Sequence, residues 1–137
     1  NGVLYALIGV LFWFAYGSTG AVLAAAAALG VAHIVYPVIK RHYRRKRPFH
    51  FDRSVPSLLP PLDEHSFPSG HMMSCVAVMI PLCVAVPAMV PWTVGTLILV
   101  GWGRLVAGHH YPSDLAAGGL LGGLAAMPMV AAQMSFG

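Results

Sequence analysis

Three residues have the types and the spacing needed for acid–base and nucleophilic chemistry. His110 precedes Asp114 by four residues, across a short turn that contains Pro112. A carboxylate at this separation could hold the imidazole Nδ1–H and leave Nε2 free to act as a nucleophile or base. His109, five residues from Asp114, is the competing candidate for that role. His71 stands at the start of a long apolar run and could donate or accept a second proton.

The residues just before His71 indicate an anion site. The chain there reads Pro68-Ser69-Gly70. If Ser69 caps a helix, the backbone N–H groups of the first turn and the positive helix end attract an anion. Gly70 would let an oxyanion approach the backbone with no side chain in the way. A plain turn followed by a helix cap is the simpler alternative for these residues.

Positive charge is concentrated close to these motifs. The polar connection 40–68 holds seven of the eight basic residues, namely Lys40, Arg41, Arg44, Arg45, Lys46, Arg47 and Arg53, and the eighth is Arg104. Ammonium and guanidinium groups beside fixed histidines suit a phosphate. Taken alone, such a cluster is also typical of the cytoplasmic end of a membrane helix or of a surface that binds anionic lipid headgroups.

Apolar helices must position these residues. Of the 137 residues, 58% are hydrophobic and 9% are charged, whereas soluble domains carry about 25% charged residues. Apolar stretches cover 2–17, 19–39, 69–90, 91–108 and 113–136, and each approaches the roughly 20 residues that cross a bilayer as a helix. We therefore predict an all-α fold, a polytopic membrane bundle with five spanning helices. It forms one domain over 1–137, with loop 40–68 carrying part of the site.

Counting the crossings brings the chemistry to one end of this bundle. The end of 19–39, the start of 69–90 and the turn between the last two stretches fall on the same side of the membrane. All charged side chains lie in the connection 40–68 between the first two of these points or near the last turn, at Arg104 and Asp114, and the connections 18–20 and 88–91 carry none. The sequence therefore predicts a single polar site.

Other residues predict how the helices pack. Pro81 and Pro87 both fall within 69–90, where membrane helices tolerate the kinks that proline causes. Doubled small-xxx-small spacing predicts a close helix contact, through Gly118, Gly119, Gly122 and Gly123. His33, about two turns before the basic cluster, is expected to form a hydrogen bond between helices.

Together the motifs resemble the three-part signature of the type 2 phosphatidic acid phosphatase (PAP2) superfamily, which includes vanadium haloperoxidases and bacterial acid phosphatases. The matching residues, in chain order, are Lys40, Arg47 and Pro48, then Pro68 to His71, then Arg104, His110 and Asp114. One departure is Gly103, where the family usually has a serine before the arginine. Because the membrane branch commonly has six helices, the resemblance also implies that an N-terminal helix is absent from this chain.

The resemblance implies a metal-independent lipid phosphatase that needs no cofactor. The phosphate oxygens would be held by Lys40, Arg47, Arg104, Ser69 and Gly70. His110, oriented by Asp114, would attack phosphorus and form a phosphohistidine. His71 would protonate the leaving group and then activate water, so a bell-shaped pH dependence is expected.

The substrate is expected to be a lipid phosphate in the bilayer, such as phosphatidate, phosphatidylglycerophosphate, a polyprenyl diphosphate or a lipid A phosphate, with no nucleic-acid partner. The protein is placed in the cell membrane, specifically a bacterial inner membrane with the site on the extracytoplasmic side, although the positive-inside rule alone would favour the cytoplasm. The segment 57–62 could be a flap over the lipid entry route or a rigid connector.

Two other functions fit part of the pattern. His71, His110, Asp114 and Glu64 could form a metal hydrolase site, although nearby cations would repel a metal ion. An anion transporter or headgroup-binding protein would need the cations but not the His110–Asp114 pair.

Overall fold

The computed structural model describes residues 2–50 and 63–136, and these residues are helical apart from short connections. In chain order the elements are α1 (Gly2–Tyr16), α2 (Thr19–Tyr43), the 3-10 helix η1 (Pro48–His50), α3 (Gly70–Ala85), the 3-10 helix η2 (Pro87–Met89), α4 (Val90–Val106) and α5 (Pro112–Phe136). The prediction of an all-α bundle with five main helices is confirmed. The segment 57–62 lies outside the described residues.

Three described helical segments are long and apolar enough to cross a membrane, namely Thr19–Tyr43, Pro87–Val106 and Pro112–Ser135. The other two apolar helices, α1 and α3, have 15 and 16 residues, fewer than the roughly 20 of a full span. Large apolar side chains on the helices face outward, such as Trp92, Leu99 and Ile34, which are 78%, 73% and 72% exposed. These features are those of a multi-pass membrane protein with an apolar outer surface.

The expectation that α3 would continue through Pro87 is wrong. Pro81 is accommodated inside α3, as predicted, but the helix ends at Ala85. Val86, the residue before Pro87, has φ −134° and ψ 84°, because the proline ring disfavours helical backbone in the preceding residue. Pro87 then begins η2, where a missing N–H costs nothing.

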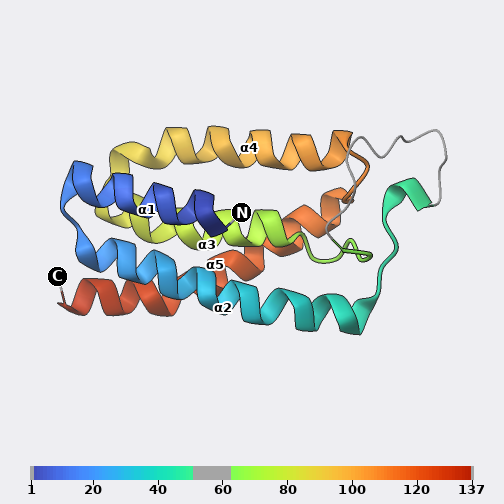
Figure 1. Cartoon of the computed structure of the whole chain (residues 1–137), viewed down its shortest axis with the longest axis horizontal. Helices are drawn as coiled ribbons and strands as arrows, with labels where there is room; N and C mark the ends of the chain where they lie inside the picture. Colours follow the sequence, from blue (N-terminus) through green and yellow to red (C-terminus); the bar gives the residue numbers. More distant parts are fainter. Residues whose placement is uncertain (1, 51–62, 137) are drawn as a thin grey trace.

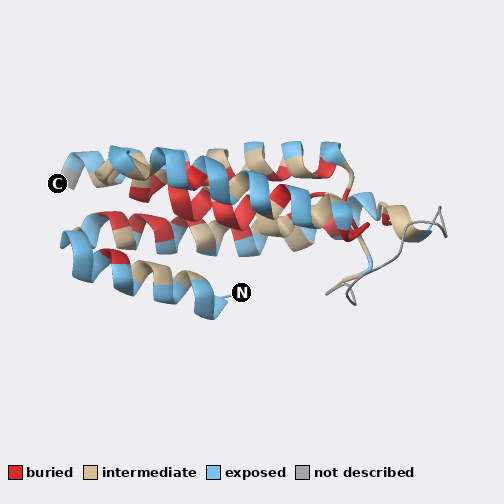
Figure 2. Cartoon of the chain, turned by 90° about the horizontal axis from the view of Figure 1, so that it is seen from above, coloured by how far each residue is buried: buried red, intermediate tan, exposed pale blue. Residues whose placement is uncertain are grey.

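The centre of the bundle is formed by α2, α3 and α5, which all pack against one another. α4 contacts α3, and α1 contacts α2. Figure 2 shows buried residues concentrated along these central helices, while α1 and the outward faces are mostly exposed. α3 is therefore held on several sides, which fixes the position of its first turn.

Close contact between α3 and α5 depends on two of the four glycines. A Cβ atom on Gly118 would lie 2.5 Å from the Ser69 carbonyl oxygen, and one on Gly122 would collide with the Met73 carbonyl oxygen. Gly119 and Gly123 would make only ordinary contacts, at 3.9 and 3.8 Å. The predicted small-residue contact is therefore confirmed for Gly118 and Gly122, which are four residues apart, but not for Gly119 and Gly123.

The predicted meeting of polar segments at one end is also confirmed. In Figure 1 the end of α2, the start of α3 and the α4–α5 turn lie together at the right-hand end of the bundle. The α1–α2 turn and η2 lie at the opposite end.

Candidate active site

The end of α2 supplies the first two cations. The helix stops where Arg44 adopts a left-handed conformation with φ 47°, and this turn redirects the chain toward Arg47. Both Lys40 and Arg47 are buried, and both bind Asp63. Lys40 Nζ lies 2.9 Å from each Asp63 carboxylate oxygen, and Arg47 Nη2 lies 2.8 Å from Oδ1. These two predicted phosphate ligands are therefore ion-paired within the chain.

The same cations keep Asp63 ionised. Burial by itself would raise the pKa of this carboxyl group, but the hydrogen bond and charge of Lys40, followed by those of Arg47, outweigh it. The pKa of Asp63 consequently lies below its ordinary value.

The first turn of α3 carries the second motif. Ser69 is the N-cap, as predicted, and its hydroxyl accepts a hydrogen bond from the Met72 N–H at 3.4 Å. The absence of a side chain at Gly70 also matters for packing, because an added Cβ would lie 3.3 Å from the Tyr36 ring. The Ser69 N–H donates to the Asp114 carbonyl at 3.0 Å, so the starts of α3 and α5 are joined directly.

The α4–α5 turn carries the third motif. Gly108 permits the turn with φ 67°, and α5 then begins at Pro112. The fully buried Asp114 reaches back, and its Oδ2 accepts a hydrogen bond from the Tyr111 N–H at 2.8 Å. This interaction is half of a capping box. Asp114 Oδ1 also accepts a hydrogen bond from Arg45 Nη1 at 2.8 Å, so the carboxylate is held from two directions.

The Asp114 carboxylate lies beside His110. The distance from His110 Nδ1 to Asp114 Oδ2 is 3.7 Å, which is slightly longer than a hydrogen bond. Nδ1 is buried without a hydrogen-bond partner among the described residues. Burial lowers the pKa of His110, Asp114 opposes this effect, and the cations Arg47 and Lys40 lower it further. His110 is therefore favoured in the neutral form that a nucleophile requires.

His109 is held in a different way from His110. Its carbonyl accepts a hydrogen bond from Arg47 Nη1 at 2.8 Å, and its ring lies edge-on to Phe49. The Asp114 carboxylate, which is ion-paired with Arg45, has the His110 imidazole beside it at 3.7 Å. This geometry favours His110 over His109 as the oriented imidazole.

One cavity of about 600 Å³ brings most of these side chains together. Six of the eight predicted site residues line it, namely Lys40, Arg47, Gly70, His71, Arg104 and His110. Ser69 and Asp114 are fully buried behind the lining and support α3 and His110, respectively. His33 also lines the cavity, but the expected interhelical bond is wrong, because its Nδ1 bonds the Leu29 carbonyl of its own helix at 3.0 Å.

Sequence reasoning assigned no role to Asp63, Arg45 or Tyr111. Arg45 bonds Asp114 and Ser113, and its guanidinium lies 4.0 Å from the centre of the Tyr111 ring. The presence of acidic residues among seven cations in 40–68 was the available signal for Asp63. The structure groups no three His, Cys, Asp or Glu residues of the described chain in a way that could hold a metal ion.

Comparison with known proteins adds the family. The chain is 36% identical over 120 residues to decaprenylphosphoryl-5-phosphoribose phosphatase of Mycolicibacterium smegmatis, covering 77% of this chain and 62% of the relative. It is 32% identical over 94 residues to undecaprenyl-diphosphatase of Sulfolobus acidocaldarius, covering 67% and 45%. The chain thus spans about half of the length of these curated relatives.

A solved structure shares the fold. The first transmembrane PAP2 type phosphatidylglycerolphosphate phosphatase from Bacillus subtilis superposes with a TM-score of 0.69 and 24% identity, covering 98% of this chain and 69% of that chain. The model of the PAP2 superfamily matches residues 21–136, which include all three motifs. This match agrees with the clustered lysine, arginine and histidine side chains of the cavity, and the chain belongs to the PAP2 superfamily.

Proposed function

We propose that this chain is the catalytic bundle of an integral membrane lipid phosphatase, which removes a terminal phosphate from a lipid through a phosphohistidine intermediate. The observation that carries the proposal is the common cavity at the charged end of an apolar bundle, which His71 and His110 line together with four cations, namely Lys40, Arg41, Arg47 and Arg104. A phosphate ester needs fixed positive charge, a nucleophile and a proton donor in one place. The cations and the two histidines of the cavity are the side chains that we assign to these three roles.

Chemistry begins at His110. Its neutral Nε2 attacks phosphorus, forming a P–N bond as the P–O bond to the lipid breaks. His71 transfers a proton to the departing oxygen, so the lipid leaves as an alcohol or, from a diphosphate, as a protonated monophosphate. A water molecule then gives a proton to His71 and attacks phosphorus, which releases inorganic phosphate and restores His110. Asp114 stabilises the charged imidazole during these steps.

The nonbridging oxygens are held by Lys40, Arg47 and Arg104 together with the N–H groups at the start of α3. Arginine suits this role because its planar donors match the geometry of phosphate oxygens. Charge that develops in the transition state meets fixed donors, so little reorganisation is needed. Ser69 contributes by capping α3 and directing its first turn toward the cavity.

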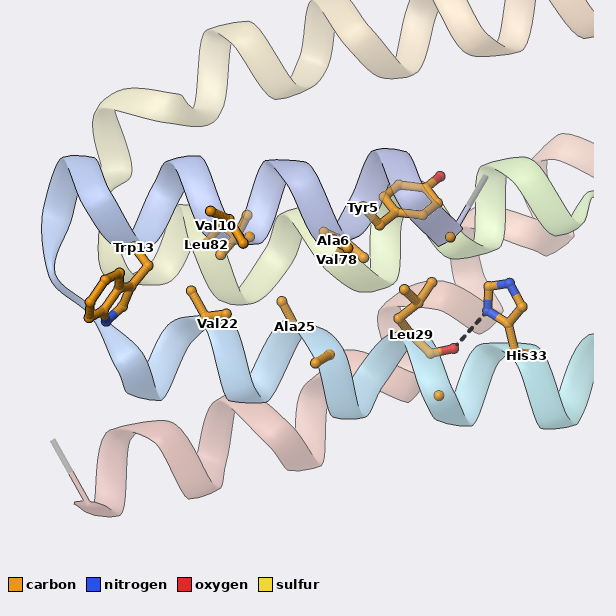
Figure 3. Close-up of a pocket in the computed structure, with 14 residues that line it drawn as sticks. Tyr5, Ala6, Val10, Trp13, Val22, Ala25, Leu29, His33, Val78 and Leu82 are labelled. Carbon is orange, nitrogen blue, oxygen red and sulfur yellow. Dashed lines mark hydrogen bonds between the residues drawn. The ribbon is translucent and has the colours of Figure 1, made fainter.

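A second cavity supports a lipid substrate. It has a volume of about 580 Å³ between α1 and α2, and it shares Tyr5 and His33 with the cation-lined cavity. Figure 3 shows apolar side chains from both helices and from α3 along it, including Ala6, Leu29 and Val78. An apolar chain in this cavity would continue into the bilayer while its phosphate reaches the cations.

For the substrate we favour a polyprenyl phosphate or diphosphate, because the relatives described above carry such lipids in their names. Phosphatidate and phosphatidylglycerophosphate remain the comparison substrates. We place the protein in a bacterial inner membrane with the cavity on the extracytoplasmic side, since phosphate binding would account for the positive charges that would otherwise indicate the cytoplasm.

The test is release of inorganic phosphate from these lipids by detergent-purified protein in the presence of EDTA. His110→Ala should abolish release, while His42→Ala, an exposed histidine at the same end of the bundle, should not change it. If His109→Ala abolished phosphate release and His110→Ala retained it, His109 would be the nucleophile instead of His110. Loss on chelation would favour a metal hydrolase, and no release from any lipid would favour anion transport or headgroup binding.

A further inference from the structure

The hydrogen bonds of Lys40 pose a problem for phosphate binding. An ammonium group has three N–H donors. Lys40 Nζ lies 2.9 Å from three acceptors, the two carboxylate oxygens of Asp63 and the carbonyl oxygen of His65. All of its donors therefore have partners within the chain. A phosphate oxygen can bind Lys40 only if one of these acceptors leaves.

Asp63 is the acceptor that can leave most readily. Its side chain is 40% exposed, whereas those of Lys40 and Arg47 are 7% and 3% exposed. Water can solvate a carboxylate in that position, while a buried cation left without a counter-ion is strongly destabilising. The His65 carbonyl, in contrast, belongs to the backbone near the bridge between Lys46 and His65.

Arg104 provides the contrast. Within the described residues 2–50 and 63–136 it has no carboxylate partner, yet it lines the same cavity. Arg41 lines the cavity as well, also without a carboxylate partner among those residues. The positive charge of the cavity is therefore divided between two cations that no described carboxylate pairs and two cations, Lys40 and Arg47, that are already paired with Asp63.

We propose that the Asp63 carboxylate stands in for a phosphate on Lys40 and Arg47, and that substrate phosphate must displace it in order to bind. Carboxylate and phosphate oxygens suit the same donors. Before phosphate binds, Asp63 compensates the charge of two buried cations. When phosphate binds, it first meets Arg104 and then exchanges with Asp63, whose carboxylate turns into water. Asp63 is thus a competitor that sets the affinity for phosphate. This inference rests on the proposed function only for the identity of the natural ligand.

The test uses inorganic phosphate as the probe and the whole chain in detergent. We expect Asp63→Asn to lower the dissociation constant for phosphate by about tenfold, the scale of one charge-assisted hydrogen bond, measured by calorimetry or by the rise in melting temperature with phosphate concentration. Glu64→Gln is the matched control, because it removes the same charge from the adjacent exposed residue. Its dissociation constant should stay near that of the wild type.

Several results would overturn the proposal. Unchanged or weaker phosphate binding in Asp63→Asn would mean that Asp63 orients Lys40 and Arg47 for the ligand instead of competing with it. An equal decrease in the dissociation constant for phosphate in Glu64→Gln would mean that the effect comes from the change in net charge and not from the position of Asp63. If Asp63→Asn unfolds without phosphate, added phosphate should restore the folded protein, since it replaces the lost anion, and failure to do so would also contradict the proposal.

Parallel assays of lipid dephosphorylation separate this inference from the proposed function. Tighter phosphate binding in Asp63→Asn, combined with no hydrolysis of any lipid by the wild type, would refute the phosphatase and retain the role of Asp63. Hydrolysis by the wild type without tighter binding in Asp63→Asn would refute the role of Asp63 alone.

Discussion

Replacing Gly118 by alanine should disable the site from a position that touches no substrate. The new Cβ would lie 2.5 Å from the Ser69 carbonyl oxygen, and ordinary contact begins at 3.4 Å. The two backbones must therefore separate by almost 1 Å, because a carbonyl in a helix cannot rotate away as a side chain could. Overpacking of this kind costs roughly 1–3 kcal/mol, against about 1 kcal/mol gained from the higher helix propensity of alanine.

The functional consequence should exceed the loss of stability. Gly118 lies one turn after Asp114, and Ser69 is bonded to the Asp114 carbonyl at 3.0 Å. Separation at this point moves the first turn of α3 away from the His110–Asp114 pair. A misplacement of about 1 Å between reacting groups can cost about a hundredfold in rate. We expect a loss of this size in kcat/KM for phosphate release from a polyprenyl diphosphate, with only a modest change in melting temperature.

Gly119→Ala is the control, because its Cβ would meet Met72 at an ordinary 3.9 Å. This variant should retain wild-type activity and should be equally stable or slightly more stable. Wild-type activity in Gly118→Ala, or an equal loss in both variants, would refute the argument that the α3–α5 contact sets the geometry of the site.

Three further predictions concern the site itself. The acid-side midpoint of the profile of kcat/KM against pH should lie below the ordinary histidine pKa of about 6.5, because burial and nearby cations lower the pKa of His110 and keep it neutral to lower pH. A midpoint above that value would contradict this prediction. Asp114→Asn should reduce kcat by about 10²–10⁴-fold while phosphate binding, measured by calorimetry, survives, and near-normal turnover would remove Asp114 from the mechanism. Ala6→Phe should narrow the apolar cavity and raise KM for a long-chain lipid without affecting p-nitrophenyl phosphate; an equal effect on both substrates would argue against chain binding there.

The part of the site that could be predicted from sequence depends on short spacings and on the fact that successive membrane helices run in opposite directions. Ser69 could be recognised as a helix cap because a cap acts within one turn, and His110 and Asp114 could be paired because four residues across a turn keep them close. The convergence of the three motifs followed from apolar stretches that have to alternate direction. The end of α3 before Pro87 was not predicted, because a proline can either kink a helix or end it, and packing at the end of α3 decides between these outcomes.

The sequence by itself determined an apolar helical bundle with one charged end, since its apolar stretches approach the roughly 20 residues that cross a bilayer as a helix, and a helix satisfies its own backbone hydrogen bonds there. It also predicted which side chains would carry the chemistry, and six of those eight residues line one cavity. Only the tertiary structure decided their partners, because ion pairs between distant residues depend on how helices pack. Asp63 meets Lys40 across 23 residues, and Arg45 meets Asp114 across 69. No periodicity in the chain encodes those contacts. The rotation of α5 against α3 likewise decided which of its glycines face α3.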